Sequence, residues 1–120
     1  MSSPTQRSLA LLRAQGYIVQ VVERWQHFAR VRIDLFNGID IVAIREHGLG
    51  VLGVQTTSRS NLSARRKKLL AEPRMRLWVA CGNQLHLHGW KKVKGRWQVV
   101  EEALKIGDFP VDNATDKRTV

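Results

Sequence analysis

The sequence predicts a single α/β domain in which a mixed β-sheet of about five strands is flanked by helices. Two observations predict this class. Segments with the period-2 alternation of strands and segments with helical spacing follow one another in the order α-β-β-β-α-β-β. The chain of 120 residues is also long enough for one hydrophobic core, and its 43% hydrophobic content is that of a globular protein.

The first half of the chain predicts one helix and three strands. Residues 5–16, TQRSLALLRAQG, carry leucines near helical spacing and end on a glycine, which favours a helix with a glycine stop. Residues 17–25, YIVQVVERW, alternate and are rich in β-branched side chains, which predicts a strand. A turn signal at Asn37-Gly38 precedes a second strand over 39–44, and residues 51–57, VLGVQTT, form the third.

The second half predicts a helix, a buried strand and a hairpin. Residues 60–72, SNLSARRKKLLAE, open with possible N-caps and have leucines at helix-compatible spacing, and Pro73 ends this helix. Residues 74–82, RMRLWVACG, are apolar and continuous, which favours a strand buried on both faces. Residues 84–100, QLHLHGWKKVKGRWQVV, alternate around a tight turn at Lys94-Gly95 and predict a terminal hairpin.

Charge is the strongest global signal. The formal net charge is +10, and residues 1–100 hold 17 of the basic side chains against only five acidic ones. Such a field favours polyanionic partners, with nucleic acid first and an anionic membrane surface second. A basic surface kept for solubility, or for docking an acidic protein, is the alternative that charge alone leaves open.

The sequence also limits the compartment and the domain count. No apolar run approaches the roughly 20 residues that span a bilayer, and the first residues lack the pattern of a secretory signal. Cys81 is the only cysteine, so neither an intramolecular disulfide nor a zinc-ligand set is expected, and a cytoplasmic setting is the simplest. We expect an α/β domain over residues 1–106 and a polar C-terminal tail over 107–120.

Acidic side chains are so scarce in the first 100 residues that each one is informative. A carboxylate within an apolar strand is costly to bury unless it is paired or bound to a metal. Asp40 lies between Ile39 and Ile41, and Glu23 lies at the end of the first predicted strand. Asp34, just before the turn, could either cap that turn or join a site.

The order of helix, strand, Asp-bearing hairpin, polar-ended strand and basic helix resembles a known family. Over roughly residues 5–90 it is similar to the αβββαβ core of the PD-(D/E)XK nucleases, with their restriction endonuclease-like fold, and most to the small Holliday junction resolvase-like and phage-type endonucleases. In that family an Asp and a second acid on adjacent strands hold a divalent metal, and a Lys two residues on assists the attacking water. The motif GIDIVAI places Asp40 at the Asp position, and GVQTT places Gln55 at the second acid and Thr57 where Lys is usual.

The resemblance implies Mg²⁺ or Mn²⁺ as cofactor. Its catalytic residues would be Asp40, Gln55, Thr57 and Glu23, with Glu23, Asp40 and Gln55 as metal ligands and Asp34 as a candidate fourth. Two departures bear on activity. A Gln carbonyl supplies less charge to a hard cation than a carboxylate, and a Thr hydroxyl cannot replace an ammonium group.

Two basic segments could contact nucleic acid. The run RRKK and residues 59–61 follow the third strand, where side chains and free helical N–H groups could bind phosphates, although a solvated helix face has the same pattern. The segment WKKVKGRW places lysines between Trp90 and Trp97, which could stack on bases or fill the core. Either Arg59 or Arg65, or a second metal, could supply the charge that Thr57 lacks. The nucleic-acid-binding candidates are Arg59, Asn61, Arg65, Arg66, Lys67, Lys68, Lys91, Lys92 and Lys94.

His86 and His88 share one strand face, a spacing that can bind zinc, but no third ligand lies nearby in the sequence. A structural role is therefore favoured for both.

The sequence thus leads to two functional hypotheses of different class. The first is a metal-dependent DNA endonuclease, a hydrolase of phosphodiester bonds whose small size suggests selectivity for DNA structure rather than sequence. The second is a catalytically inactive nucleic-acid-binding module with the same fold, favoured by the missing acid and Lys at positions 55 and 57. A basic adaptor for an acidic protein is a third. The resemblance also implies a homodimer in the cytoplasm, bacterial, archaeal or phage-encoded, with no membrane partner.

Overall fold

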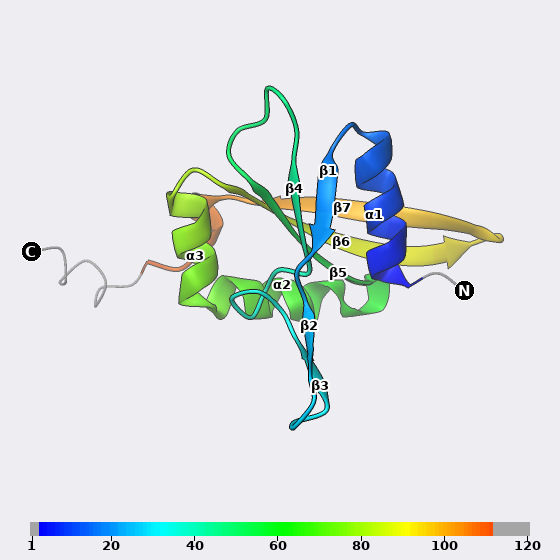
Figure 1. The fold of residues 1–120 in the computed structure, drawn as a ribbon, viewed down its shortest axis with the longest axis horizontal. Coiled ribbons are helices and arrows are strands. Elements are labelled where there is room, and N and C mark those ends of the chain that lie inside the picture. The colour runs from blue at the N-terminus through cyan, green and yellow to red at the C-terminus, as the bar shows by residue number, and fades with distance from the viewer. Residues whose placement is uncertain (1–2, 112–120) are drawn as a thin grey trace, which may run out of the picture.

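The computed structural model describes residues 3–111 and shows a twisted sheet with helices on both of its faces (Figure 1). The elements, in chain order, are α1 (Pro4–Ala14), β1 (Ile18–Val21), β2 (Arg24–Gln26), β3 (Val31–Ile33), β4 (Ile41–Ile44), β5 (Leu52–Ser58), the single turn η1 (Arg59–Asn61), α2 (Leu62–Ala71), α3 (Pro73–Ala80), β6 (Gln84–Val93), β7 (Arg96–Leu104) and η2 (Ile106–Asp108).

The sheet has five strands in the order β1-β4-β5-β6-β7. All neighbouring pairs are antiparallel except β5 and β6, which are parallel and joined by the crossover that contains α2 and α3. This mixed sheet with flanking helices confirms the predicted fold class. Between β1 and β4 the chain leaves the sheet to form a separate two-stranded hairpin from β2 and β3.

Two hydrophobic clusters fix the helices to the sheet, because successive residues of a strand point to opposite faces. On one face α1 covers a cluster made of Leu9, Leu12, Ile41, Ala43, Leu52 and Val54. On the other face α2 and α3 cover a cluster made of Ile39, Leu69, Met75, Leu85, Leu87, Leu104 and Phe109. The first cluster thus includes residues of β4 and β5, and the second includes Ile39, just before β4, together with residues of β6 and β7.

The prediction of a strand over 74–82 is wrong, because residues 73–80 form helix α3. A continuous apolar run does not distinguish a buried strand from a buried helix, and the helix start signals decide here. The Glu72 side chain caps the helix by accepting a hydrogen bond from the backbone N–H of Arg74, and Pro73 occupies the first turn. Met75 and Trp78 then face the core at helical spacing. Cys81, expected within the buried strand, is exposed instead.

The predicted strand over 17–25 is also too long, because it divides into β1 and β2. The backbone N–H of Val22 still bonds to the carbonyl of Asp40, and the chain then leaves the sheet for the β2–β3 hairpin. The predicted turn at Asn37-Gly38 is confirmed. A Cβ atom at Gly38 would lie 2.6 Å from Met75 Sδ, so glycine lets the turn pack on α3 without displacing the Met75 side chain.

The terminal hairpin of β6 and β7 is confirmed with its turn at Lys94-Gly95. Both residues have positive φ angles, of 50° and 78°, as a two-residue hairpin turn of type I′ requires. Phe109, within the segment expected to be a tail, is 5% exposed and belongs to the core, while residues 112–120 lie outside the described residues. Across the part of the chain that the structure describes, no helix is both long and apolar enough to cross a bilayer.

A buried polar network ties α1 to β6. The hydroxyl of Ser8 lies 2.8 Å from His88 Nδ1 and accepts a hydrogen bond from Trp90 Nε1 at 2.9 Å. Since Ser8 and His88 are fully buried, the pair is inaccessible to a substrate, and its role is structural. Burial lowers the pKa of His88 to about 4, so the ring is neutral. Because the Ser8 oxygen already accepts from Trp90, its hydroxyl group is free to donate a hydrogen bond to His88 Nδ1. Trp90 is accordingly a core residue, whereas Trp97 is 44% exposed under the guanidinium of Arg7.

Substitution of Ser8 by Ala should therefore destabilise the fold. The change leaves the Trp90 N–H and His88 Nδ1 buried without their partner, which should lower the free energy of unfolding by about 2 kcal/mol. Urea unfolding followed by tryptophan fluorescence measures the effect. Ser63→Ala, at an exposed position of α2, is the matched control and should change stability little. Equal stabilities for the two variants would contradict the network.

Candidate functional site

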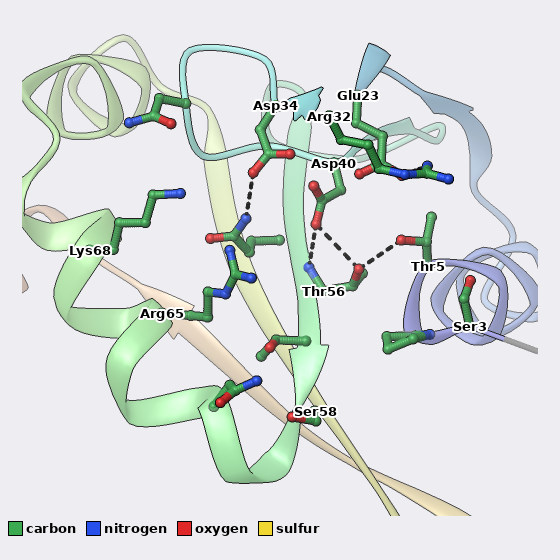
Figure 2. A pocket seen from close by; sticks show the side chains of 15 residues that line it. Ser3, Thr5, Glu23, Arg32, Asp34, Asp40, Thr56, Ser58, Arg65 and Lys68 are labelled. Carbon is green, nitrogen blue, oxygen red and sulfur yellow. Dashed lines mark hydrogen bonds and ion pairs between the residues drawn. The ribbon is translucent and has the colours of Figure 1, made fainter. Parts of the chain in front are cut away.

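The site begins where β5 extends past its neighbour β4. Only Leu52–Val54 of β5 pair with β4, whereas the whole of β5 pairs with β6 on the other side. Asp40 directly precedes β4, and its carboxylate bonds to the part of β5 that has no strand partner on this side. Its Oδ2 accepts hydrogen bonds from the backbone N–H of Thr56 at 2.8 Å and from the Thr56 hydroxyl at 3.2 Å (Figure 2).

Three carboxylates meet at this edge. One ligand oxygen from each of Glu23, Asp34 and Asp40 lies within 4.8 Å of the others. The β2–β3 hairpin explains the meeting, because Arg24 pairs with Ile33 and so brings the flanking Glu23 and Asp34 to the base of the hairpin. The cluster therefore joins acids from two ends of one hairpin with an acid from the sheet.

The electrostatics of the cluster favour a bound cation. The pKa of Asp40 is raised to about 8, mainly by burial and also by the hydrogen bond with Asp34 and the negative charges of Asp34 and Glu23. Carboxylates this close cannot all be ionised without a compensating positive charge. Arg32 supplies part of it by donating to Glu23 Oε1 at 3.0 Å. A divalent cation would supply the rest.

Gln55 adds an oxygen that lacks a partner. Its Nε2 donates to Asp34 Oδ2 at 3.0 Å, while its Oε1 is buried and has no hydrogen-bond partner among residues 3–111. Buried acceptors are rarely left unpaired, so this oxygen calls for a donor or a cation. The Gln55 amide lies beside the cluster because its Nε2 bonds to Asp34, and rotation of the amide group by half a turn would turn Oε1 toward Asp34 instead. The three carboxylates and this oxygen would then offer a cation oxygen donors only, which suits Mg²⁺ or Mn²⁺ and does not suit a metal that prefers thiolate or imidazole.

The cluster lies in an open pocket of about 640 Å³ whose opposite wall is basic. Arg65 and Lys68 reach into it from α2, one helical turn apart on the same side of the helix (Figure 2). Thr57 is 5% exposed and lines the same pocket. The pocket therefore combines an acidic metal-binding side with a cationic side that could hold a phosphate.

The structure brings most of the predicted site residues together. Glu23, Asp34, Asp40, Gln55, Thr57, Asn61, Arg65 and Lys68 all line this pocket. The other basic candidates do not. Arg66 pairs with Glu102 at 3.3 Å, and Lys67 is exposed on α2 outside the lining. Arg59 lies in η1, also outside the lining, and Lys91, Lys92 and Lys94 belong to the β6–β7 hairpin.

Among the residues of the pocket that were not predicted as site residues, three bear directly on the acid cluster. Arg32 pairs with Glu23, Thr56 holds Asp40, and the Thr5 hydroxyl lies 2.9 Å from that of Thr56. Arg32 stands two residues before Asp34, and strand alternation could have placed both on one side. No local signal marks Thr5, whose contact is 51 residues away in the chain.

Comparison with known proteins gives no relative for this chain: no protein-family model, curated protein or solved structure matches it. The resemblance to PD-(D/E)XK nucleases thus stays a prediction, and the geometry of the site alone supports the proposals that follow.

The pKa of Asp40 predicts an unusual dependence of stability on pH in the absence of metal. The folded chain holds the Asp40 proton up to about pH 8 and the unfolded chain only to 3.8, so the free energy of unfolding falls as the pH rises between these values. His88 acts in the opposite direction between about pH 4 and its ordinary 6.5, because its pKa is lowered by folding. Between pH 6.5 and about 8 the effect of Asp40 is therefore unopposed.

We expect urea unfolding in EDTA to show lower stability at pH 8 than at pH 6.5, and Asp40→Asn to remove this difference. Asparagine keeps an oxygen for the Thr56 N–H but does not titrate. Glu46→Gln, at an exposed acid outside the cluster, should keep the difference. If the native chain were equally stable at both pH values, the raised pKa of Asp40 would be refuted.

Proposed function

We propose that this protein is a metal-dependent nuclease that hydrolyses phosphodiester bonds in DNA. The observation that carries the proposal is the presence, in one pocket, of the carboxylate cluster on one side and of two cations on the other. The cluster consists of Glu23, Asp34 and Asp40, and the cations are Arg65 and Lys68 of α2. Phosphodiester hydrolysis needs both sides, a site for a hard cation and a set of charges for the phosphate.

Asp40, Asp34, Glu23 and Gln55 would hold Mg²⁺ or Mn²⁺. Their charge, their oxygen donors and the unpartnered Gln55 acceptor fit such an ion. When bound, the metal supplies Lewis acidity toward a phosphoryl oxygen and lowers the pKa of a bound water. Asp40 must lose its proton to join this set, so metal affinity should increase as the pH approaches 8.

The chain's own cations would position the phosphate. Arg65 presents a planar guanidinium that can bond two phosphate oxygens, and Lys68 presents a point charge one turn further along α2. These two groups are placed to stabilise the negative charge that develops during hydrolysis, which is the role the Thr57 hydroxyl cannot take. The Thr57 hydroxyl group can still donate a hydrogen bond to a water molecule in the pocket or accept one from it.

DNA is the proposed substrate because the chain is strongly basic and three of its cations line the pocket. Residues 1–100 carry a formal excess of 12 basic side chains, and Arg32, Arg65 and Lys68 line the pocket itself. Contacts of this kind recognise the phosphate backbone and fix its register. The inactive nucleic-acid-binding module remains the second candidate, favoured by the absence of an ammonium group at position 57.

Metal binding can be tested directly with Mn²⁺ by isothermal titration at pH 8. Asp40→Asn should weaken Mn²⁺ binding at least about tenfold, because it removes one charged ligand from the set. Gln55→Glu should strengthen binding, since it adds a charged oxygen at a position that already faces the cluster. Glu46→Gln is the matched control. If Asp40→Asn bound Mn²⁺ as tightly as the native chain, the metal site would be wrong.

Cleavage can be tested on labelled duplex, single-stranded and four-way-junction DNA with Mg²⁺ or Mn²⁺. We expect metal-dependent cutting that is lost in Asp40→Asn and reduced at least about tenfold in Lys68→Met. Lys67→Met is the matched control, because the neighbouring Lys67 is an exposed lysine on the same helix outside the pocket. Tight DNA binding without cutting would instead establish the inactive module, and the absence of both would point to an acidic protein partner.

A further inference from the structure

The β2–β3 hairpin, residues 24–33, projects from the body of the molecule as a separate arm (Figure 1). Its strands pair only with each other and have three residues each. A two-stranded hairpin of this size is marginal in water unless something packs against it. The arm therefore has the properties of a segment that is completed by a partner.

The arm carries large apolar side chains where water should meet them. Phe28 at the tip is 99% exposed, and Trp25 and Val31 are 50% and 48% exposed. The tip is nevertheless held in shape. The Gln26 carbonyl accepts from Arg30 N–H at 2.7 Å, and the Gln26 side chain accepts from Phe28 N–H at 3.3 Å. An aromatic ring displayed on a pinned turn is suited to stacking rather than to filling a core.

The charges of the arm select the class of partner. Residues 24–33 contain Arg24, Arg30 and Arg32 together with His27, and no acidic residue. Two copies of such an arm would repel each other, so arm-to-arm pairing in a dimer is disfavoured. A polyanion with flat rings is complementary to both the arginines and the aromatic side chains, and nucleic acid is the polymer with these properties.

The arm is also continuous with the candidate site. Its base is flanked by Glu23 and Asp34, and the Trp25–Arg32 cross-strand pair places Trp25 on the same hairpin face as the Arg32 that lines the pocket. A strand whose phosphate lay between the acid cluster and α2 would therefore have its neighbouring nucleotides against this face. The arm therefore offers further contacts to a nucleic-acid strand that leaves the pocket along this face.

We propose that the β2–β3 hairpin is a DNA-binding arm in which Phe28 stacks on an unpaired or unstacked base of the nucleic acid whose phosphate lies in the pocket. The substrate class is then DNA with accessible bases, such as a bulge, a nick or a junction, rather than intact duplex. This inference rests on the proposed function for the placement of the strand. Unstacking a base costs least where pairing is already lost, so a single exposed ring gives preference for such structures.

The test measures DNA binding without catalysis. Fluorescence anisotropy in EDTA compares a duplex bearing a two-base bulge with an intact duplex of the same sequence. We expect Phe28→Ala to weaken binding to the bulged duplex about tenfold and to leave the intact duplex nearly unchanged, while Phe28→Trp keeps the preference. Leu49→Ala is the matched control, because Leu49 is 75% exposed in the β4–β5 connection, outside the arm.

A stacked base can also be observed directly. 2-Aminopurine placed in the bulge should change its fluorescence on binding the native chain and not on binding Phe28→Ala. If Phe28→Ala bound both duplexes as the native chain does, the arm proposal would be overturned while metal-dependent cleavage could still stand. If Phe28→Ala instead changed the oligomeric state in analytical ultracentrifugation, the arm would be a self-association element, which also overturns the proposal. If the native chain preferred the bulged duplex but did not cleave DNA, the proposed nuclease activity would be wrong and the arm proposal would stand.

Discussion

The site depends on one hydrogen bond, in which the Asp40 carboxylate accepts from the backbone N–H of Thr56. Because β4 stops pairing at Val54, the edge of β5 beyond it would otherwise offer its backbone to water. The Asp40 side chain accepts the hydrogen bond of the Thr56 N–H, which a backbone carbonyl of a longer β4 would otherwise accept. The bond satisfies the strand edge and, at the same time, holds a buried carboxylate at the mouth of a pocket.

Three parts of the molecule converge on this point. The hairpin base brings Glu23 and Asp34, helix α2 brings Arg65 and Lys68, and α1 brings Thr5, whose hydroxyl contacts that of Thr56. Opposite charges thus face each other across the pocket, while the acids of the cluster repel one another. Such an arrangement lowers stability when it is empty, which is common where a protein is organised for binding rather than for stability.

The sequence allowed much of this to be predicted, for physical reasons that differ between residues. Asp40 was identifiable because a carboxylate in an apolar strand is costly to bury. Gln55 was identified by its position in the motif GVQTT, which resembles that of the nuclease family, and strand alternation then placed Thr57 on the same face. The helix at 73–80 was missed because its apolar run is compatible with either structure until Glu72 and Pro73 are considered as a cap. Arg32 and Thr5 were missed because their roles arise from contacts between elements, which no local pattern encodes. The separation of β2 and β3 from the sheet was missed for the same reason.

The place of the hairpin in the chain has a consequence for how this protein can vary. The arm is inserted between β1 and β4, which are partners in the same antiparallel pair, and Glu23 and Asp34 sit where the two ends of the arm come together. Adding or deleting a matched pair of residues further out would leave the register of the sheet and the spacing of the acids untouched. Two more residues in each strand would lengthen the arm by about 7 Å. The reach of the arm can therefore change by insertion and deletion independently of the acid cluster at its base, so that the same cluster could be combined with arms of different length.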